Sequence, residues 1–309
     1  MAEHIPVLLA EVLEGLAIRT DGLYIDATFG RGGHSAAILE RLGPAGRLLA
    51  VDRDADAVAY GRERFSGDRR FRIERGNFSG LGAIAVRHGF GGRTDGILFD
   101  LGVSSPQLDE ADRGFSFMQD GPLDMRMDRD EGRSAGDWLD QVSERELRDV
   151  LKTYGEEKQA ARIARAILRA REAGSIRRTR QLAEIVESVQ GRRRPGDRHP
   201  ATKTFQAIRI RINRELEAIT DALSQVREIL APGGRLAVIS FHSLEDRIVK
   251  RFMRDAALDD PRYRGLPEVP REARAWLRVA GKARTAAAAE AAANPRARSA
   301  RLRVAEKLS

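Results

Sequence analysis

The chain has 309 residues, of which 42% are hydrophobic, so it can hold one large domain or two smaller ones around a sizeable core. Its formal net charge of +8 is compatible with a polyanionic partner such as nucleic acid, and equally with an arginine surplus that serves solubility. The absence of cysteine excludes disulfides, thiolate metal sites and every mechanism with a cysteine nucleophile. We see no signal-peptide pattern and no apolar stretch of about 18 residues, and we therefore expect a cytoplasmic protein.

Short apolar segments alternate with helical patterns through the first hundred residues, and glycine, aspartate and asparagine occupy the joints. Strands that are apolar on both faces and alternate with helices indicate a parallel sheet covered on both sides. The sequence therefore predicts an α/β fold. The expected strands are residues 23–28, 47–52, 71–74 and 96–100, and the expected helices are residues 35–42, 55–65 and 81–88.

The strand pattern stops after about residue 106 and resumes only after residue 200. Between them we predict helices at 137–151, 156–170 and 180–189, followed by the basic loop 191–200. We interpret this stretch as a helical insertion that interrupts the α/β domain. The predicted organisation is residues 1–105 for the first part of the α/β domain, 106–200 for the insertion and 201–309 for the second part.

The second part opens with a long amphipathic helix at 203–230, whose apolar residues fall at steps of three or four. The segment Pro-Gly-Gly at 232–234 is expected to stop it. A buried strand at 235–240 and a helix at 244–255 follow. The tail at 259–294 is predicted to be irregular with a weak helix in its alanine run, and 299–306 is predicted to be an edge strand.

The segment DATFGRGGHS at 26–35 follows a predicted strand and opens a helix. Its glycines allow a ligand to approach the backbone closely at the carboxyl end of a parallel strand. The spacing is not the G-x-G-x-x-G of dinucleotide sites, so no pyrophosphate cradle is indicated. A tight strand-to-helix turn without a ligand is the alternative reading.

Acidic residues end successive predicted strands at Asp26, Asp52 and Asp100. Asp52 stands 22 positions after Gly30, where a carboxylate can accept hydrogen bonds from both ribose hydroxyls of an adenosine. Its alternative role is to cap the next helix. The ring of Phe78, after the third strand, can pack on adenine or belong to the core. Three acids facing one crevice suit a cationic sulfonium nucleoside, and we therefore predict S-adenosylmethionine as the cofactor.

The turn after Asp100 contains Ser104, Ser105, Pro106 and Gln107. Small hydroxyl residues and a proline at the rim of the cofactor crevice can hold a flat group, and amino-methyltransferases place an acid or a serine followed by prolines here. Asp100, Ser104 and Ser105 are therefore the candidate catalytic residues. The alternative is a helix N-cap, because Ser-Pro also begins helices.

His242 follows the fifth predicted strand and is a candidate general base, a base-stacking group or a polar residue at a strand end. A serine hydrolase is disfavoured because no G-x-S-x-G segment is present. His4 and His199 show no metal-ligand spacing, and no metal site is predicted. A basic cluster at the exit of the insertion can track phosphates or form a solvated face. It comprises Arg192, Arg193, Arg194, Arg198, Lys203, Arg209 and Arg211.

Taken together, these motifs resemble the bacterial 16S ribosomal RNA cytosine-N4 methyltransferases of the RsmH (MraW) type. The matching segments occur in family order and cover the chain nearly end to end; the least similar part is the alanine-rich stretch at 285–293. They are HIPVLLAEV at 4–12, DATFGRGGHS at 26–35, DGILFDLGVSSPQLD at 95–109, RGFSF at 113–117, PLDMRM at 122–127, YGEE at 154–157, HPATKTFQAIRIRIN at 199–213, PGGRLAVISFHSLEDRIVK at 232–250 and NPRARSARLRVAEK at 294–307.

The resemblance implies a Rossmann-like class I S-adenosylmethionine-dependent methyltransferase domain, interrupted by a helical substrate-recognition domain. It implies methylation of N4 of a decoding-centre (P-site) cytidine in 16S ribosomal RNA, within the small ribosomal subunit or its precursor. The implied cofactor contacts are Gly32, Gly33, His34, Asp52, Phe78, Asp100 and Gln107.

The chemistry is compatible with that reaction, because carbon-5 methylation of pyrimidines normally needs the cysteine that this chain lacks. An exocyclic amine can instead attack the methyl group directly. A methyltransferase for another nucleic-acid amine, a nucleotide-dependent dehydrogenase and a non-catalytic RNA-binding protein remain alternatives. Membrane association is not expected, and a homodimer is left open.

Overall fold

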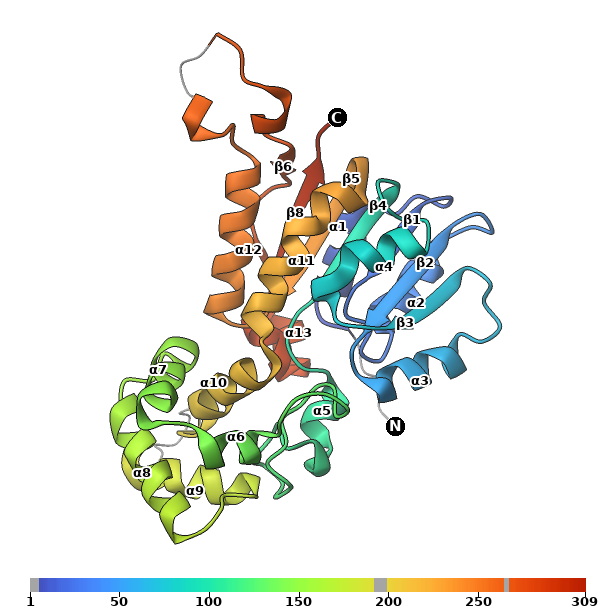
Figure 1. Cartoon of the computed structure of the whole chain (residues 1–309). Helices are drawn as coiled ribbons and strands as arrows, with labels where there is room; N and C mark the ends of the chain where they lie inside the picture. Colours follow the sequence, from blue (N-terminus) through green and yellow to red (C-terminus); the bar gives the residue numbers. More distant parts are fainter. Residues whose placement is uncertain (1–5, 192–198, 264–266) are drawn as a thin grey trace. The chain divides into compact units, whose positions relative to one another are not determined.

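The computed structural model describes residues 6–191, 199–263 and 267–309 (Figure 1). The chain divides into two compact units, each of which is described by itself. The sheet unit comprises Met1–Gly102 and Leu216–Ser309, and the helical unit comprises Val103–Glu215. The helical unit includes the predicted insertion at 106–200, whose role in substrate recognition stays a prediction.

The sheet unit is built on one sheet with the strand order β3-β2-β1-β4-β5-β8-β6, and β7 pairs with β8. Strands β1 to β5 are mutually parallel, whereas β8 runs antiparallel to β5 and to β6. The predicted α/β fold with a parallel sheet is therefore confirmed. The strands are β1 (Leu23–Asp26), β2 (Arg47–Asp52), β3 (Phe71–Arg75), β4 (Thr94–Asp100), β5 (Leu230–Ser240), β6 (Leu277–Val279), β7 (Arg284–Thr285) and β8 (Arg301–Lys307).

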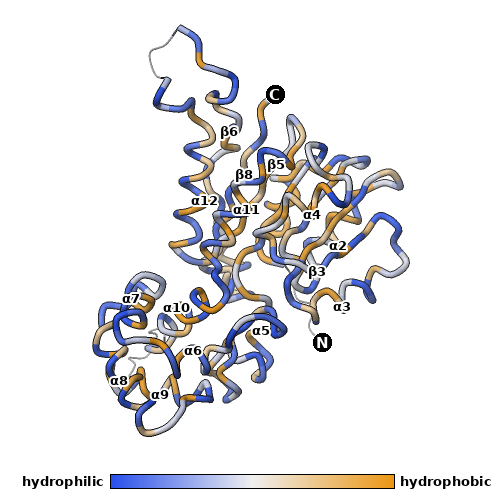
Figure 2. Tube along the Cα trace, viewed as in Figure 1, coloured by the Kyte–Doolittle hydropathy of each residue, from blue (hydrophilic) through white to orange (hydrophobic). Residues whose placement is uncertain are grey.

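Alternate residues of the central strands enter two separate cores, one on each face of the sheet. Ile25 and Leu49 pack with helices α4, α11 and α12, whereas Tyr24 and Leu48 pack with α1, α2 and α3. Figure 2 shows apolar and polar residues alternating along α12, as expected for a helix that covers a sheet. The helices are α1 (Leu9–Leu16), α2 (Gly33–Leu39), α3 (Ala55–Arg64), α4 (Leu81–Arg87), α11 (Glu215–Ile229), α12 (Ser243–Ala256) and α13 (Ala288–Ala293).

The helical unit packs five helices around one apolar core, which includes Leu139, Leu147, Ile163 and Leu182. A shorter helix, α5, lies at its beginning. Among the residues that the structure describes, no helix of either unit is long and apolar enough to cross a membrane. The helices of this unit are α5 (Ser105–Asp109), α6 (Ala135–Gln141), α7 (Glu144–Gly155), α8 (Ala160–Ala173), α9 (Thr179–Gln190) and α10 (Thr202–Asn213).

Two helices predicted as continuous are interrupted in the structure. The predicted helix at 137–151 is α6 and α7, because Val142 is extended and Ser143 caps α7 by accepting from the backbone N–H of Glu146. The predicted helix at 203–230 is α10 and α11, because Arg214 adopts a left-handed conformation with φ of 51°. A single such residue ends one helix without disturbing the apolar periodicity on either side.

Two expectations for the last strands are also wrong. The Pro-Gly-Gly segment does not lie between helix and strand, because α11 ends at Ile229 and β5 already begins at Leu230. The register of β5 with β4 shifts at this segment, from Thr94 opposite Leu230 to Gly96 opposite Arg235. Strand β8 is not an edge strand, because β5 pairs on one side of it and β6 and β7 on the other.

Candidate active site at the carboxyl edge of the sheet

The glycine loop joins β1 to α2 in a conformation that requires glycine. Gly30 and Gly32 have positive φ angles of 55° and 68°. A Cβ atom on Gly32 would lie 2.5 Å from the ring of Phe29, and one on Gly33 would lie 2.4 Å from Cγ of Pro6. Any side chain at these two positions would therefore collide with Phe29 or Pro6, so the tight loop requires glycine there.

Asp26 is the last residue of β1, and its side chain forms hydrogen bonds within the glycine loop. Its side chain is buried, with 1% of the residue exposed. One carboxylate oxygen accepts a hydrogen bond of 2.7 Å from the Ser35 hydroxyl, and the other accepts one of 3.2 Å from the backbone N–H of Thr28. Burial raises the pKa of Asp26, although the hydrogen bond from Ser35 opposes the shift. Asp26 therefore ties the two ends of the glycine loop together.

Asp52 joins the end of β2 to the same loop. Its Oδ2 accepts from the backbone N–H of Gly30 at 2.8 Å, and its Oδ1 accepts from that of Asp54 at 2.9 Å. Asp54 is the N-cap of α3, because its side chain accepts from the backbone N–H of Asp56. The capping role considered for Asp52 is thus taken by Asp54. Each Asp52 oxygen keeps a second lone pair for a ligand hydroxyl.

Burial raises the pKa of Asp52 to about 6, against the opposing hydrogen bonds from Asp54 and Gly30. The nearby carboxylates of Asp54 and Asp26 contribute to this rise in the pKa. The carboxylate is therefore mostly ionised at neutral pH and becomes protonated in mildly acidic solution.

Asp100 and His34 meet at the end of β4. His34 Nε2 lies 3.6 Å from Oδ2 of Asp100, and the backbone N–H of Asp100 donates to the Thr28 hydroxyl at 2.6 Å. Within the described residues, Asp100 Oδ1 and both ring nitrogens of His34 are buried without a hydrogen-bond partner. Unpaired buried polar atoms are costly, so their presence together indicates a place for a polar ligand. A carboxylate in such a place suits the cationic sulfonium predicted from the sequence.

Phe78 begins a short 3-10 turn, Phe78–Gly80, after β3. The residue is partly exposed. Its ring packs edge-to-face on Phe99 of β4, with 5.7 Å between ring centroids. One side of the ring is therefore anchored to the core, which is compatible with both the adenine contact and the core role considered for it.

Ser104, Ser105 and Gln107 belong to the helical unit. Ser104 is the N-cap of α5, and its backbone N–H donates to the buried Gln107 side chain at 3.0 Å. Pro106 lies in the first turn. The helix-capping alternative is therefore realised for Ser104. The roles of the two serines as acceptors for the target amine, and of Gln107 as a cofactor contact, stay predictions.

Three residues of this edge carried no prediction from the sequence. Thr28 links the glycine loop to the end of β4, and Asp54 caps α3. Glu245, one turn into α12, accepts from two backbone N–H groups and approaches His242. The only sequence signal for Glu245 is its position three residues after His242, the N-cap residue of α12, where glutamate often closes a capping box.

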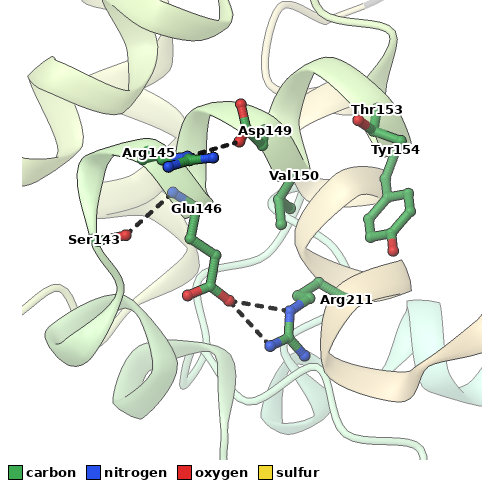
Figure 3. A pocket seen from close by; sticks show the side chains of 8 residues that line it. All are labelled: Ser143, Arg145, Glu146, Asp149, Val150, Thr153, Tyr154 and Arg211. Atoms are coloured by element: carbon green, nitrogen blue, oxygen red, sulfur yellow. Dashed lines mark hydrogen bonds and ion pairs between the residues drawn. The ribbon is translucent and has the colours of Figure 1, made fainter.

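A second, polar hollow lies in the helical unit between α7 and α10 (Figure 3). Arg211 points into it and donates two hydrogen bonds, of 3.0 and 3.3 Å, to Oε1 of Glu146. Its guanidinium also lies 5.9 Å from the ring centroid of Trp138. The hollow is lined by Ser143, Arg145, Glu146, Asp149, Val150, Thr153, Tyr154 and Arg211.

The predicted basic cluster is only partly described. Residues 192–198, which hold four of its arginines, lie outside the described residues. Arg209 donates to both oxygens of the buried Glu215 at 2.8 Å, and Arg211 pairs with Glu146. The Lys203 ammonium donates to the backbone carbonyl of Glu156. The described members of the cluster thus make contacts within the protein. These contacts favour a solvated face over a phosphate-binding surface for these members.

The strand order, the glycine loop and the strand-end acids define a Rossmann-type α/β protein with a candidate nucleoside cofactor site at the carboxyl edge of its sheet. The chain belongs to the MraW methylase family, whose model matches residues 1–308. The resemblance found in the motifs is thereby confirmed, and so is the S-adenosylmethionine-dependent methyltransferase class with its Rossmann-like fold.

Two relatives carry the name ribosomal RNA small subunit methyltransferase H. The protein of Thioalkalivibrio sulfidiphilus (strain HL-EbGR7) is 58% identical over 309 residues, which cover 99% of this chain and 98% of that protein. The protein of Xanthomonas euvesicatoria pv. vesicatoria (strain 85-10) is 56% identical over 313 residues, which cover 99% and 89%. A solved rRNA methylase from Streptococcus thermophilus is 14% identical, with a TM-score of 0.42 and coverage of 99% and 100%.

Proposed function

We propose that this chain transfers a methyl group from S-adenosylmethionine to the exocyclic N4 of a decoding-centre (P-site) cytidine in 16S ribosomal RNA. Relatives named ribosomal RNA small subunit methyltransferase H, at 55–58% identity along nearly the whole chain, support action on small-subunit ribosomal RNA. The observation that supports an amine as the methyl acceptor is the buried Oδ1 of Asp100 at the end of β4, which has no hydrogen-bond partner among the described residues.

The residues of the glycine loop and the strand ends fit the cofactor. The turn at Gly32 and Gly33 leaves no side chain of its own between the backbone and a ligand, and Asp52 offers acceptors to the ribose hydroxyls. The partly exposed ring of Phe78 offers a face to adenine. Bound there, S-adenosylmethionine supplies an electrophilic methyl carbon on a positively charged sulfur.

Asp100 is the residue best suited to act on the target amine. The N4 lone pair is conjugated with the ring, so the amine is nearly non-basic and becomes positive only as the methyl group arrives. A carboxylate that accepts from N4–H stabilises that developing charge more than it stabilises the bound substrate, which is the condition for raising the rate. Ser104 and Ser105 are weaker candidates because their hydroxyls are neutral acceptors.

The substrate is proposed to be the RNA within the small ribosomal subunit or its precursor, in the cytoplasm. The net charge of +8 favours association with an RNA phosphate backbone. A cytidine that is stacked or paired in the RNA must be taken out of its stack, at a cost of a few kcal/mol. The alternatives are methylation of another nucleic-acid amine and RNA binding without catalysis.

The test is transfer of a tritiated methyl group to purified small subunits at different stages of assembly, followed by identification of the labelled nucleoside. We expect label in N4-methylcytidine at a single position of 16S ribosomal RNA. Label in another nucleoside would move the activity to a different amine. Tight RNA binding with no transfer at any stage would favour the non-catalytic alternative.

A further inference from the structure

The chain segments that follow β4 and β5 emerge side by side at the carboxyl edge of the sheet. Asp100 pairs with Ile239, and the backbone N–H of Leu101 donates to the carbonyl of Ile239 at 3.0 Å. One residue further, a Cβ on Gly102 would lie 3.5 Å from the ring of Phe241. His242, which follows Phe241, therefore belongs to the same edge as Asp100.

His242 is held against a buried carboxylate. The Glu245 side chain is 1% exposed, and its Oε2 accepts from the backbone N–H groups of Phe241 and His242 at 2.8 and 3.2 Å. Its Oε1 lies 3.1 Å from Nε2 of His242, whose side chain is 11% exposed. Glu245 therefore fixes both the turn between β5 and α12 and the imidazole that the turn presents.

The imidazole has hydrogen-bonding capacity left over. Within the described residues, neither ring nitrogen of His242 completes a hydrogen bond, despite the close approach of Glu245. The other acid of this turn is committed elsewhere: Asp246 accepts from Arg303 at 2.7 Å and from Arg301 at 3.2 Å on β8. The Glu245 carboxylate is thus the acidic group of α12 that faces the imidazole.

His242 also has a structural place, because it is the N-cap residue of α12 and forms a capping box with Glu245. The residue before a helix is best filled by serine, threonine, aspartate or asparagine, whose short side chains cap the first turn. A nearly buried imidazole with unpaired nitrogens costs free energy unless another group meets it. Its place at the same edge of the sheet as Asp100 makes it available to a reacting group bound there.

We propose that His242 is a catalytic residue that accepts the proton leaving the cytidine N4, and that Glu245 is its positioning residue. The inference rests on the proposed function. The bond from N4 to the methyl carbon forms as the bond from sulfur to that carbon breaks, and one N4 proton passes to an imidazole nitrogen. The positive charge that leaves sulfur thus ends on the imidazole, next to the Glu245 carboxylate.

In this charge balance Asp100 and His242 have different roles. Asp100 accepts a hydrogen bond from N4–H and stabilises the charge that develops during transfer. His242 removes the proton, so the product leaves as a neutral amine and the transfer cannot reverse through a protonated amine. General-base catalysis of this kind contributes about 10²- to 10⁴-fold to the rate.

The first test uses His242→Asn, which keeps a polar side chain but holds no proton. We expect single-turnover methyl transfer to small subunits to fall about 100-fold or more, while calorimetric affinity for S-adenosylmethionine and affinity for RNA stay within about twofold. The matched control is His88→Asn, which removes another histidine paired with a glutamate, Glu74. It should react at the full rate.

Two further variants separate chemistry from structure. His242→Ala should recover activity on addition of free imidazole, which a structural defect would not do. Glu245→Gln should lower kcat with little change in KM for either substrate, because it misplaces the base without touching the ligands. Normal turnover by His242→Asn, or failure of imidazole to rescue a folded His242→Ala protein that still binds both substrates, would overturn the inference.

The nucleoside made by the unmodified protein separates this inference from the proposed function. If that nucleoside is N4-methylcytidine and the histidine variants react normally, only the role of His242 is wrong. If the product is another methylated nucleoside, the proposed function is wrong, and so is the proton transfer from cytidine N4 to His242.

Discussion

Replacing Asp52 by alanine should weaken the binding of S-adenosylmethionine. In the proposed cofactor site the ionised carboxylate accepts from two ribose hydroxyls, while it also accepts from the backbone N–H groups of Gly30 and Asp54. Loss of the ligand hydrogen bonds should cost about 1–3 kcal/mol. That free energy corresponds to a roughly 5- to 150-fold increase in Kd.

The pKa of Asp52 provides a second signature in the same assay. With a pKa of about 6, the carboxylate of the free protein is mostly ionised at pH 7 and mostly protonated at pH 5. Protonation removes an acceptor, so the affinity of the unmodified protein should fall about tenfold between pH 7 and pH 5. The Asp52→Ala protein has no such group and should lose that part of the pH dependence.

Isothermal titration calorimetry at pH 5, 6 and 7 measures both effects. The matched control is Asp54→Asn, which removes a neighbouring charge but keeps an N-cap side chain for α3. It should bind the cofactor almost normally. Circular dichroism should show a folded Asp52→Ala protein. If that protein binds with unchanged affinity and an unchanged pH slope, Asp52 is not part of the cofactor site.

The remaining predictions concern the chemical step, the substrate and the stability of the sheet unit. Asp100→Asn should lower single-turnover methyl transfer by about 10²- to 10³-fold with RNA affinity nearly unchanged; normal turnover at saturating cofactor would point instead to a backbone carbonyl of the following turn. Alanine at all three arginines of 192–194 should weaken RNA binding and flatten its salt dependence, because fewer counterions are released; an unchanged slope of log K against log salt would make them a solvated face. Burial opposes ionisation of Asp246, but the hydrogen bond and charge of Arg303, with the charges of Arg301 and Lys250, lower its pKa overall. The stability it confers is therefore present above pH 4 or so and lost as the pH falls through the lowered pKa. Asp246→Asn should reduce the free energy of unfolding at pH 7 by about 1–3 kcal/mol, with the difference shrinking in urea titrations as the pH falls through the lowered pKa of Asp246; a constant difference at all pH values would contradict the ion pair.

The sequence by itself determined the α/β architecture and the place of the candidate site. The central strands are apolar on both faces, a pattern that only a sheet covered on both sides satisfies. Parallel strands bring their carboxyl ends to one edge, so the glycine loop, Asp52 and Asp100 were expected to lie together there. The family could also be recognised from the sequence, because its motifs are contiguous segments that occur in the family's order along the chain.

Tertiary structure alone decided where the helices break and where the last strand lies. The periodic pattern of 203–230 runs through Arg214, since one left-handed residue costs only about 1–2 kcal/mol and leaves the apolar spacing on both sides intact. The sequence predicts an edge strand for the β8 segment because polar and apolar residues alternate along it. Its interior position depends on pairing with β5, β6 and β7, which are remote in sequence.

Tertiary structure also assigned different roles to three acids that look alike in the sequence. Asp26 is buried against Ser35, Asp52 braces the glycine loop with two lone pairs to spare, and Asp100 keeps an unpaired oxygen beside His34. Each sits at a strand end, so local spacing cannot distinguish them. Their environments differ because burial and hydrogen-bond partners come from residues that only the folded chain brings together.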